Sequence, residues 1–162
     1  MNKKAVLFLL LAPFLVIALF NHPSLDDYWN ANTIITNGRL NAVVYSFHHF
    51  SGRYFSTFLM CMLNTLPQGE IWMVELFPIL ICMAFVSILY YFIKNSFNSL
   101  SGQQALMYAL MFTLLHILNM RVLFEGLYWM SATITYQIAI LIYLAILTLI
   151  SSYFKSKSRL KL

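Results

Sequence analysis

Charged residues are scarce in this sequence. They make up 9% of the 162 residues, whereas hydrophobic residues make up 61%. Soluble domains carry about a quarter charged and slightly less than half apolar residues, so one water-facing core could not bury this much apolar surface. The scarcity excludes an ordinary soluble domain. It predicts an integral membrane protein built from helices of about 20 residues each.

Cysteine is also rare, and the distribution of positive charge is uneven. Cys61 and Cys82 both lie inside apolar segments without the spacing of a zinc site, so we interpret them as small buried residues and predict no metal site. The formal net charge of +5 comes from cations beside apolar runs rather than from a basic stripe interleaved with aromatics. This pattern excludes nucleic acid as a partner and marks the cytoplasmic ends of spans.

Long apolar runs fill much of the rest. The predicted fold is all-α, a polytopic membrane protein with about four transmembrane helices. The predicted spans cover residues 5–20, 72–93, 105–120 and 138–154. The first begins with Lys3 and Lys4, as a signal peptide would, but no small-residue cleavage pattern follows it. We therefore expect it to remain as an uncleaved span.

The distribution of cations sets the predicted orientation. With four spans, Lys3, Lys4, Lys94 and the cations of the tail at 155–162 all face the cytoplasm, as the positive-inside rule requires. Both termini are then cytoplasmic, and residues 21–71 and 121–137 form outer loops. The apolar run at 55–66 is too short to cross a bilayer. We expect it to belong to one of two amphipathic helices, Leu40–His49 and Tyr54–Leu66, on the outer membrane surface.

Three clusters in these outer loops could support chemistry, and each has a structural alternative. Asp26 and Asp27 are adjacent carboxylates, or else the start of a helix capped by Ser24 or Asp26. Arg53 follows Gly52 and could bind an anion or anchor at the membrane interface. In the third cluster, the alternatives are a helical pair of Arg121 with Glu125 and an interfacial belt of Tyr128 and Trp129.

The histidines give weaker signals. His48 and His49 are neighbours and would point in different directions on a helix, so they lack the geometry of a helical metal site. We expect His116 and Asn119, near the end of the third span, to form hydrogen bonds between helices.

The order of three motifs carries a family resemblance. These motifs are Asp26-Asp27-Tyr28, Gly52-Arg53-Tyr54, and Tyr128-Trp129 followed by Ala132 and Tyr136. In this order and on the outer side, they resemble the amino-terminal part of bacterial C-type glycosyltransferases. Those polytopic enzymes use polyprenyl-phosphate sugars and have many more spans than this chain. The resemblance leaves open a truncated product, half of a split enzyme, or a minimal relative.

The resemblance implies a site on the outer face of a bacterial cytoplasmic membrane. One carboxylate would act as general base, with Asp27 favoured over Asp26. Arg53, then Arg121 and His48, would face the phosphate, while Tyr28, Glu125, Trp129 and Tyr136 would contact the substrate. Paired carboxylates could bind a divalent metal, but the spacing does not require one, and the cofactor is unknown.

The implied partners are membrane lipid, a lipid-linked sugar and a second membrane subunit. The alternative function is that of a noncatalytic small membrane protein that binds lipid or a larger membrane partner. A transporter subunit ranks third, because Pro13 and Pro78 are the only prolines within the predicted spans.

Overall fold

A computed structural model describes residues 3–97 and 99–159, and every regular element in that part of the chain is helical. The all-α prediction is therefore confirmed. In chain order the elements are α1 (Lys3–Ala18), α2 (Leu25–Asn37), α3 (Arg39–His49), α4 (Tyr54–Leu63), the 3₁₀ turn η1 (Leu66–Gln68), α5 (Trp72–Ser96), α6 (Gly102–Leu118), the π-helical turn η2 (Phe124–Tyr128) and α7 (Met130–Arg159).

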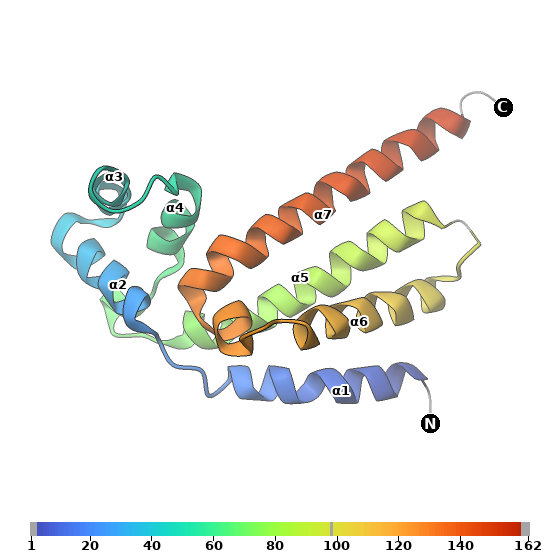
Figure 1. The fold of residues 1–162 in the computed structure, drawn as a ribbon, viewed down its shortest axis with the longest axis horizontal. Helices are drawn as coiled ribbons and strands as arrows, with labels where there is room; N and C mark the ends of the chain where they lie inside the picture. The colour runs from blue at the N-terminus through green and yellow to red at the C-terminus, as the bar shows by residue number, and fades with distance from the viewer. Residues whose placement is uncertain (1–2, 98, 160–162) are drawn as a thin grey trace.

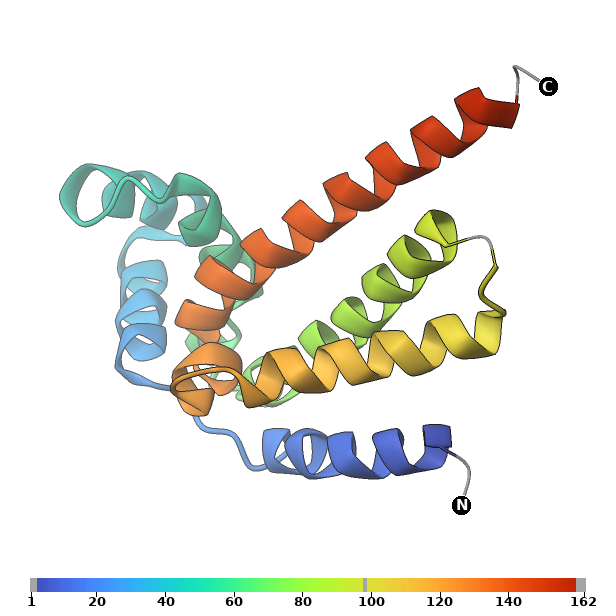
Figure 2. The ribbon, with the colours of Figure 1, turned by 45° about the vertical axis from the view of Figure 1, so that its right-hand side comes forward.

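The long helices form a bundle, and the short ones gather at one end of it (Figure 1). Helix α5 is central, with α6 and α7 packed against it, and α1 packs against α6 and α5. The main apolar core lies among these four helices and includes Phe77, Phe85, Leu110 and Ile134. Both ends of the described chain lie at the end of the bundle away from α2, α3 and α4 (Figure 2).

Two helices are long and apolar enough to cross a membrane: α5, with a mean hydropathy of 2.4, and α7 over Met130–Lys155, with 2.1. Only 33% and 22% of their most apolar stretches are buried within the protein, whereas a core helix of a soluble protein would be mostly buried. The apolar helices Ala5–Ala18 and Gly102–Leu118 are shorter. Two of the predicted spans are thus long apolar helices.

Helix boundaries differ from the predicted spans where polar residues join the helices. Helix α6 begins at Gly102 because Ser101 and Gln104 form a capping box, with N···O distances of 3.2 and 2.8 Å. Helix α7 begins at Met130, eight residues before the predicted span, and continues to Arg159 through part of the predicted tail. Residues 160–162 of that tail lie outside the described residues.

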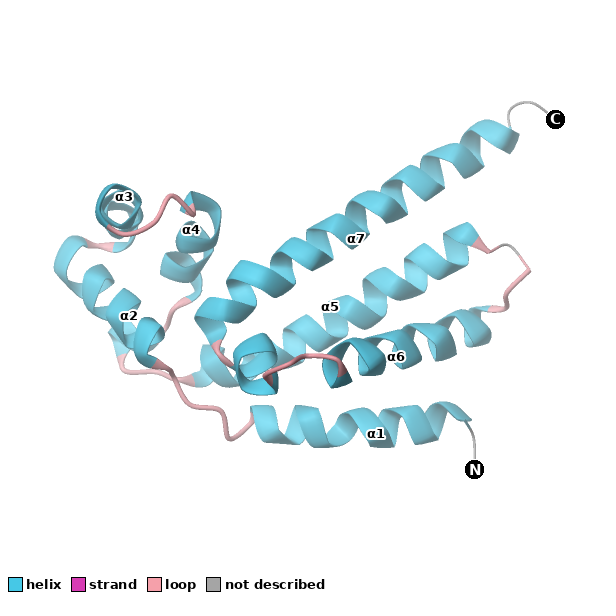
Figure 3. Ribbon diagram, viewed as in Figure 1, coloured by secondary structure: helices cyan, strands magenta, loops and turns pink. Residues whose placement is uncertain are grey.

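The segment at 21–71, predicted as an outer loop, is helical along most of its length (Figure 3). Helices α3 and α4 occupy the two segments predicted as surface helices, and α2 precedes them. Gly38 separates α2 from α3 at φ 77°, a conformation that side-chain-bearing residues rarely adopt. Arg39 then donates hydrogen bonds to the carbonyls of Met62 and Asn64, at 3.3 and 3.1 Å, which ties α3 to the end of α4.

Candidate functional site

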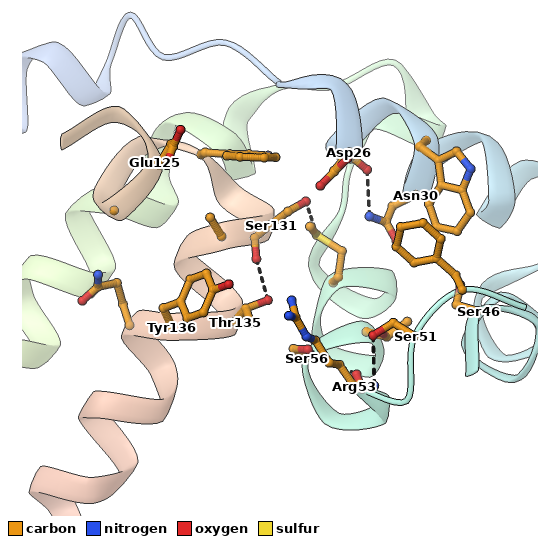
Figure 4. A pocket seen from close by; sticks show the side chains of 18 of the residues that line it. Asp26, Asn30, Ser46, Ser51, Arg53, Ser56, Glu125, Ser131, Thr135 and Tyr136 are labelled. Carbon is orange, nitrogen blue, oxygen red and sulfur yellow. Dashed lines mark hydrogen bonds between the residues drawn. The ribbon is translucent and has the colours of Figure 1, made fainter. Parts of the chain in front are cut away.

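A cavity of about 520 Å³ lies where the outer helices meet the start of α7 (Figure 4). Three separate stretches of sequence line it: the first turns of α2, the α3–α4 hairpin, and the segment from the end of α6 into α7. The residues that line it are Asp26, Trp29, Asn30, Ser46, Phe50, Ser51, Arg53, Ser56, Thr57, Met60, Met120, Arg121, Val122, Glu125, Gly126, Trp129, Ser131, Ala132, Thr135, Tyr136 and Gln137.

The cavity brings together six of the nine residues that the sequence marks as candidates. They are Asp26, Arg53, Arg121, Glu125, Trp129 and Tyr136. Figure 4 shows Asp26 and Glu125 along the side formed by α2 and η2, with Arg53 on the far side of the cavity below Ser131. Residues up to 110 positions apart in sequence therefore share one site.

Asp27 lies outside this lining, and its carboxylate is fully buried, with 0% of the residue exposed. Its Oδ2 accepts a hydrogen bond from the Ser24 backbone N–H at 2.8 Å, so the helix-start interpretation of the Asp-Asp pair is confirmed. Its Oδ1 accepts two more from Ser131, from the backbone N–H at 3.1 Å and the hydroxyl at 2.8 Å. Asp27 thus joins the start of α2 to the start of α7.

Burial also sets the protonation of Asp27. Loss of solvent raises the pKa of the carboxyl above its usual 3.8, and the hydrogen bonds from Ser24 and Ser131 lower it only in part. A carboxylate with three protein donors and no solvent access is poorly placed to reach an acceptor hydroxyl. The geometry disfavours the predicted preference for Asp27 as the base.

Asp26 has the opposite environment. It is half-buried and lines the cavity. Within residues 3–97 and 99–159, its carboxylate has no hydrogen bond or ion pair, and only its backbone carbonyl is engaged, by Asn30 Nδ2 at 2.7 Å. Asp26 is therefore the carboxylate of the pair that can meet a ligand.

Three further charged side chains of the cavity are also unpaired. Arg53, Arg121 and Glu125 are exposed, and across the described part of the chain no hydrogen bond or salt bridge engages their guanidinium or carboxylate groups. The alternative of a helical Arg121–Glu125 pair fails because these residues span a bend and the beginning of η2 rather than an α-helical turn. Two cationic and two anionic residues thus line one cavity without a hydrogen-bond or ion-pair partner for their charged groups in the described part of the chain.

Tyr28 and His48 lie outside the lining. Tyr28 is 56% exposed on α2. His48 is exposed on α3, where its ring meets the edge of Phe47 at 5.3 Å between centroids. The structure does not bring either one to the site. No group of three or more His, Cys, Asp or Glu residues in the described ranges could hold a metal ion.

Several neutral lining residues carried no sequence signal. Ser46 is 1% exposed, and its Oγ has no hydrogen-bond partner within the described structure; the same holds for the buried Trp129 Nε1. Asn30 and Gln137 are buried polar residues of the same wall. A lone Ser in an amphipathic helix looks like any polar-face residue, so only its position in the fold distinguishes Ser46.

One predicted interhelical contact is confirmed and the other is wrong. His116 Nε2 on α6 lies 2.9 Å from Gln137 Oε1 on α7, which connects α6 to a residue of the cavity wall. Asn119 lies at the C-cap of α6, and its side chain instead donates to the Leu115 carbonyl of its own helix at 2.7 Å, which also accepts from the Asn119 backbone N–H at 3.0 Å.

Buried polar contacts hold the segment that carries Glu125 in place. Asn21 Nδ2 donates to the carbonyls of Tyr128 and Val74, at 2.7 and 3.0 Å, and the Tyr128 hydroxyl donates to the Phe14 carbonyl at 2.9 Å. Turn η2 is therefore fixed against both α1 and α5. This anchoring gives the Arg121–Trp129 segment a defined position at the cavity.

Comparisons with protein-family models, curated proteins and solved structures gave no match. The likeness to C-type glycosyltransferases therefore depends on the three motifs and their order.

Gly126 supplies a test of the cavity's shape. A Cβ at this position would lie 2.7 Å from Met120 Sδ and 3.2 Å from its Cγ. We expect Gly126→Ala to move the Met120 side chain, which also lines the cavity. Because that side chain is flexible and only half-buried, the substitution should destabilise the fold by about 1 kcal/mol, the low end of the cost of overpacking. Thermal unfolding in detergent measures this change. The same substitution should cost less in a Met120→Ala background, and an equal cost in both backgrounds would contradict the clash.

Proposed function

We propose that this protein is a glycosyltransferase-like component of cell-envelope glycan assembly that handles a polyprenyl-phosphate sugar at the outer face of the membrane. The observation that carries the proposal is the cavity itself. Segments around Asp26, Arg53 and Trp129, the three places of motif resemblance, meet there and present unpaired carboxylates and guanidinium groups.

The proposed reaction assigns each charge a task. Asp26 accepts the proton of an acceptor hydroxyl, and the oxygen of that hydroxyl forms a bond to the anomeric carbon of the sugar. The bond from that carbon to the phosphate oxygen breaks, and polyprenyl phosphate leaves with the electron pair. Arg53 and Arg121 neutralise the charge on the departing phosphate, which a planar guanidinium can bind with two parallel hydrogen bonds. Trp129 and Tyr136 offer ring faces to the sugar.

The proposal includes a membrane topology. Helices α1, α5, α6 and α7 would cross the cytoplasmic membrane of a bacterium, with both termini inside and α2–α4 outside. Both ends of the described chain lie at the same end of the bundle, and the distribution of cations follows the positive-inside rule; both observations support this arrangement. Helices α1 and α6 are short for a span, but a locally thinned bilayer accommodates such a mismatch at modest cost.

Cysteine labelling tests the topology. Asn32 on α2 and Gln103 at the start of α6 are both exposed, at opposite ends of the bundle, whereas native Cys61 and Cys82 are buried. We expect a membrane-impermeant maleimide to label Asn32→Cys in intact cells and Gln103→Cys only after permeabilisation. Equal labelling of the two variants in intact cells would contradict the four-span arrangement.

The function is tested by offering purified protein in lipid nanodiscs a polyprenyl-phosphate sugar and measuring binding and sugar release. We expect wild type to bind the donor and Asp26→Asn to bind it but lose most turnover, about 10²-fold or more, because the proton acceptor is gone. Tyr28→Phe is the control, since Tyr28 lies on the same helix outside the cavity. Binding without turnover in wild type would indicate that catalysis needs a second membrane subunit.

The second candidate is a noncatalytic membrane protein that binds lipid through its outer helices. Exposed apolar side chains of α3 and α4 favour it, because amphipathic helices with such a face lie in the membrane interface. These side chains are Leu40, Val44, Tyr45, Phe47, Tyr54, Phe55 and Phe58. Failure of wild type to bind any polyprenyl-phosphate sugar in the nanodisc experiment would favour this candidate over the first.

A further inference from the structure

Glu125 has no part in the proposed transfer, yet it lies at the rim of the cavity and contributes to its lining. Asp26 suffices as proton acceptor, and Arg53 and Arg121 suffice for the phosphate. Glu125 has no cationic partner among the residues that the structure describes. A second carboxylate beside a phosphate site would repel an anionic ligand, because like charges brought together on binding cost free energy.

A ligand with both charges removes this conflict. Figure 4 shows Glu125 and Asp26 along one side of the cavity and Arg53 on the far side, so these two carboxylates are separated from the Arg53 guanidinium. Electrostatic complementarity then calls for an anionic group beside Arg53 and a cationic group beside Glu125. A neutral sugar phosphate would leave the Glu125 carboxylate without a counter-charge.

The walls of the cavity add neutral hydrogen-bonding groups to this charge pattern. Ser46 Oγ is buried and has no partner within residues 3–97 and 99–159, and Trp129 Nε1 is in the same condition. Buried polar atoms are normally satisfied, so a rotation of either side chain toward the cavity would let a bound ligand complete its hydrogen bond. A volume of about 520 Å³ suits a sugar or a lipid headgroup.

We propose that the cavity binds a zwitterionic ligand in which a phosphoryl group faces Arg53 and a protonated primary amine faces Glu125. The inference rests on the proposed function, because it names the substrate class of the same site. Two sources offer this chemistry at an outer membrane surface: the phosphate-linked amino sugar of a lipid-linked donor, and the phosphoethanolamine headgroup of a membrane lipid.

The experiment compares probes that differ in the amine. Isothermal titration calorimetry on the full chain in nanodiscs measures glucosamine 1-phosphate against glucose 1-phosphate, and glycerophosphoethanolamine against glycerophosphoglycerol. We expect the amine-bearing member of at least one pair to bind about tenfold or more tightly, the effect of one charge-assisted hydrogen bond. The pair that shows the preference identifies the source.

Variants locate the preference. Glu125→Gln should abolish the difference within the pair while leaving binding of the amine-free probe unchanged or stronger. Glu70→Gln is the matched control, since Glu70 is an exposed outer glutamate outside the cavity whose carboxylate accepts from Trp72 Nε1 at 2.6 Å.

Three outcomes overturn the inference. Equal affinities within both pairs would show that the cavity does not recognise the amine, and they would leave the proposed phosphate-sugar function unaffected. Persistence of the preference in Glu125→Gln would remove Glu125 as its origin. Absence of binding by all four probes, together with no binding of a polyprenyl-phosphate sugar, would end the proposed function as well.

Discussion

Replacing Asp27 with alanine is expected to lower the free energy of unfolding by about 3 kcal/mol or more, which is the scale of several buried donors left unsatisfied. The truncation would strip acceptors from the Ser24 N–H, the Ser131 N–H and the Ser131 hydroxyl at once. The bond from Ser24 caps α2, and the two bonds from Ser131 connect α2 to α7, which is distant in sequence. The outer helices should therefore lose their defined position over α7.

Asp26→Ala is the matched control, because the Asp26 carboxylate makes no hydrogen bond or ion pair within the described chain. Its loss should change the free energy of unfolding by less than about 0.5 kcal/mol. Unfolding by denaturant in detergent micelles, followed by tryptophan fluorescence, measures both variants. Equal stability of the two variants would show that the Asp27–Ser131 contact contributes nothing. A fall for Asp27→Ala alone would place the structural role on Asp27 and leave Asp26 available for ligand chemistry.

The pH dependence of this contact has a definite sign. Burial raises the pKa of Asp27 in the folded protein above the value of 3.8 that it has in the unfolded chain. As pH falls through the raised pKa, the folded state takes up a proton before the unfolded state does, so the contribution of Asp27 to stability increases. That contribution is complete below the unfolded pKa, and it is lost as pH rises through the folded pKa.

Asp27→Asn isolates this effect because asparagine does not titrate. We expect the stability of wild type relative to Asp27→Asn to rise as pH is lowered from neutral toward 3.8, and chemical unfolding at a series of pH values measures it. A relative stability that instead falls on acidification would mean that the hydrogen bonds from Ser24 and Ser131 outweigh desolvation. In that case the folded-state pKa would lie below 3.8.

The sequence predicted the helices whose signal is local. Continuous apolar runs are sufficient to place α5 and most of α7, because hydropathy depends only on neighbouring residues. The start of α7 at Met130 was missed, since Ser131, Thr133 and Thr135 interrupt the apolar run. A tertiary contact engages Ser131, which bonds to Asp27 across 104 positions, whereas the Thr135 hydroxyl bonds to the Ser131 carbonyl of its own helix.

The sequence predicted which segments form the candidate site, but not the role of each residue in it. Six of the predicted site residues share one cavity, and four of these six belong to the three motifs. Sequence alone could not separate Asp26 from Asp27, because adjacent carboxylates differ only in the direction that the helix gives them. It also missed Ser46, whose burial without a partner arises from how α3 packs against its neighbours.

Arg53 should carry the largest effect on ligand binding. The α3–α4 hairpin presents it at the cap position of α4, and its guanidinium has no protein partner in the part of the chain that is described. Arg53→Gln is expected to weaken binding of a polyprenyl-phosphate sugar by about 10- to 100-fold, since a charge-assisted bond to phosphate contributes about 1.5–3 kcal/mol. Arg53→Lys should give an intermediate loss, because lysine keeps the charge without the planar fork.

Two comparisons decide whether this loss belongs to the cavity. His48→Gln changes a polar residue of the same outer segment that lies outside the lining, and donor binding in nanodiscs should be unchanged. Arg121→Gln should weaken binding as Arg53→Gln does, since both arginines face the same cavity. If Arg53→Gln bound the donor as tightly as wild type while His48→Gln did not, the phosphate would lie along the exposed face of α3. The cavity would then have no part in donor recognition, and the charges of Asp26 and Glu125 would be surface charges held in solvent.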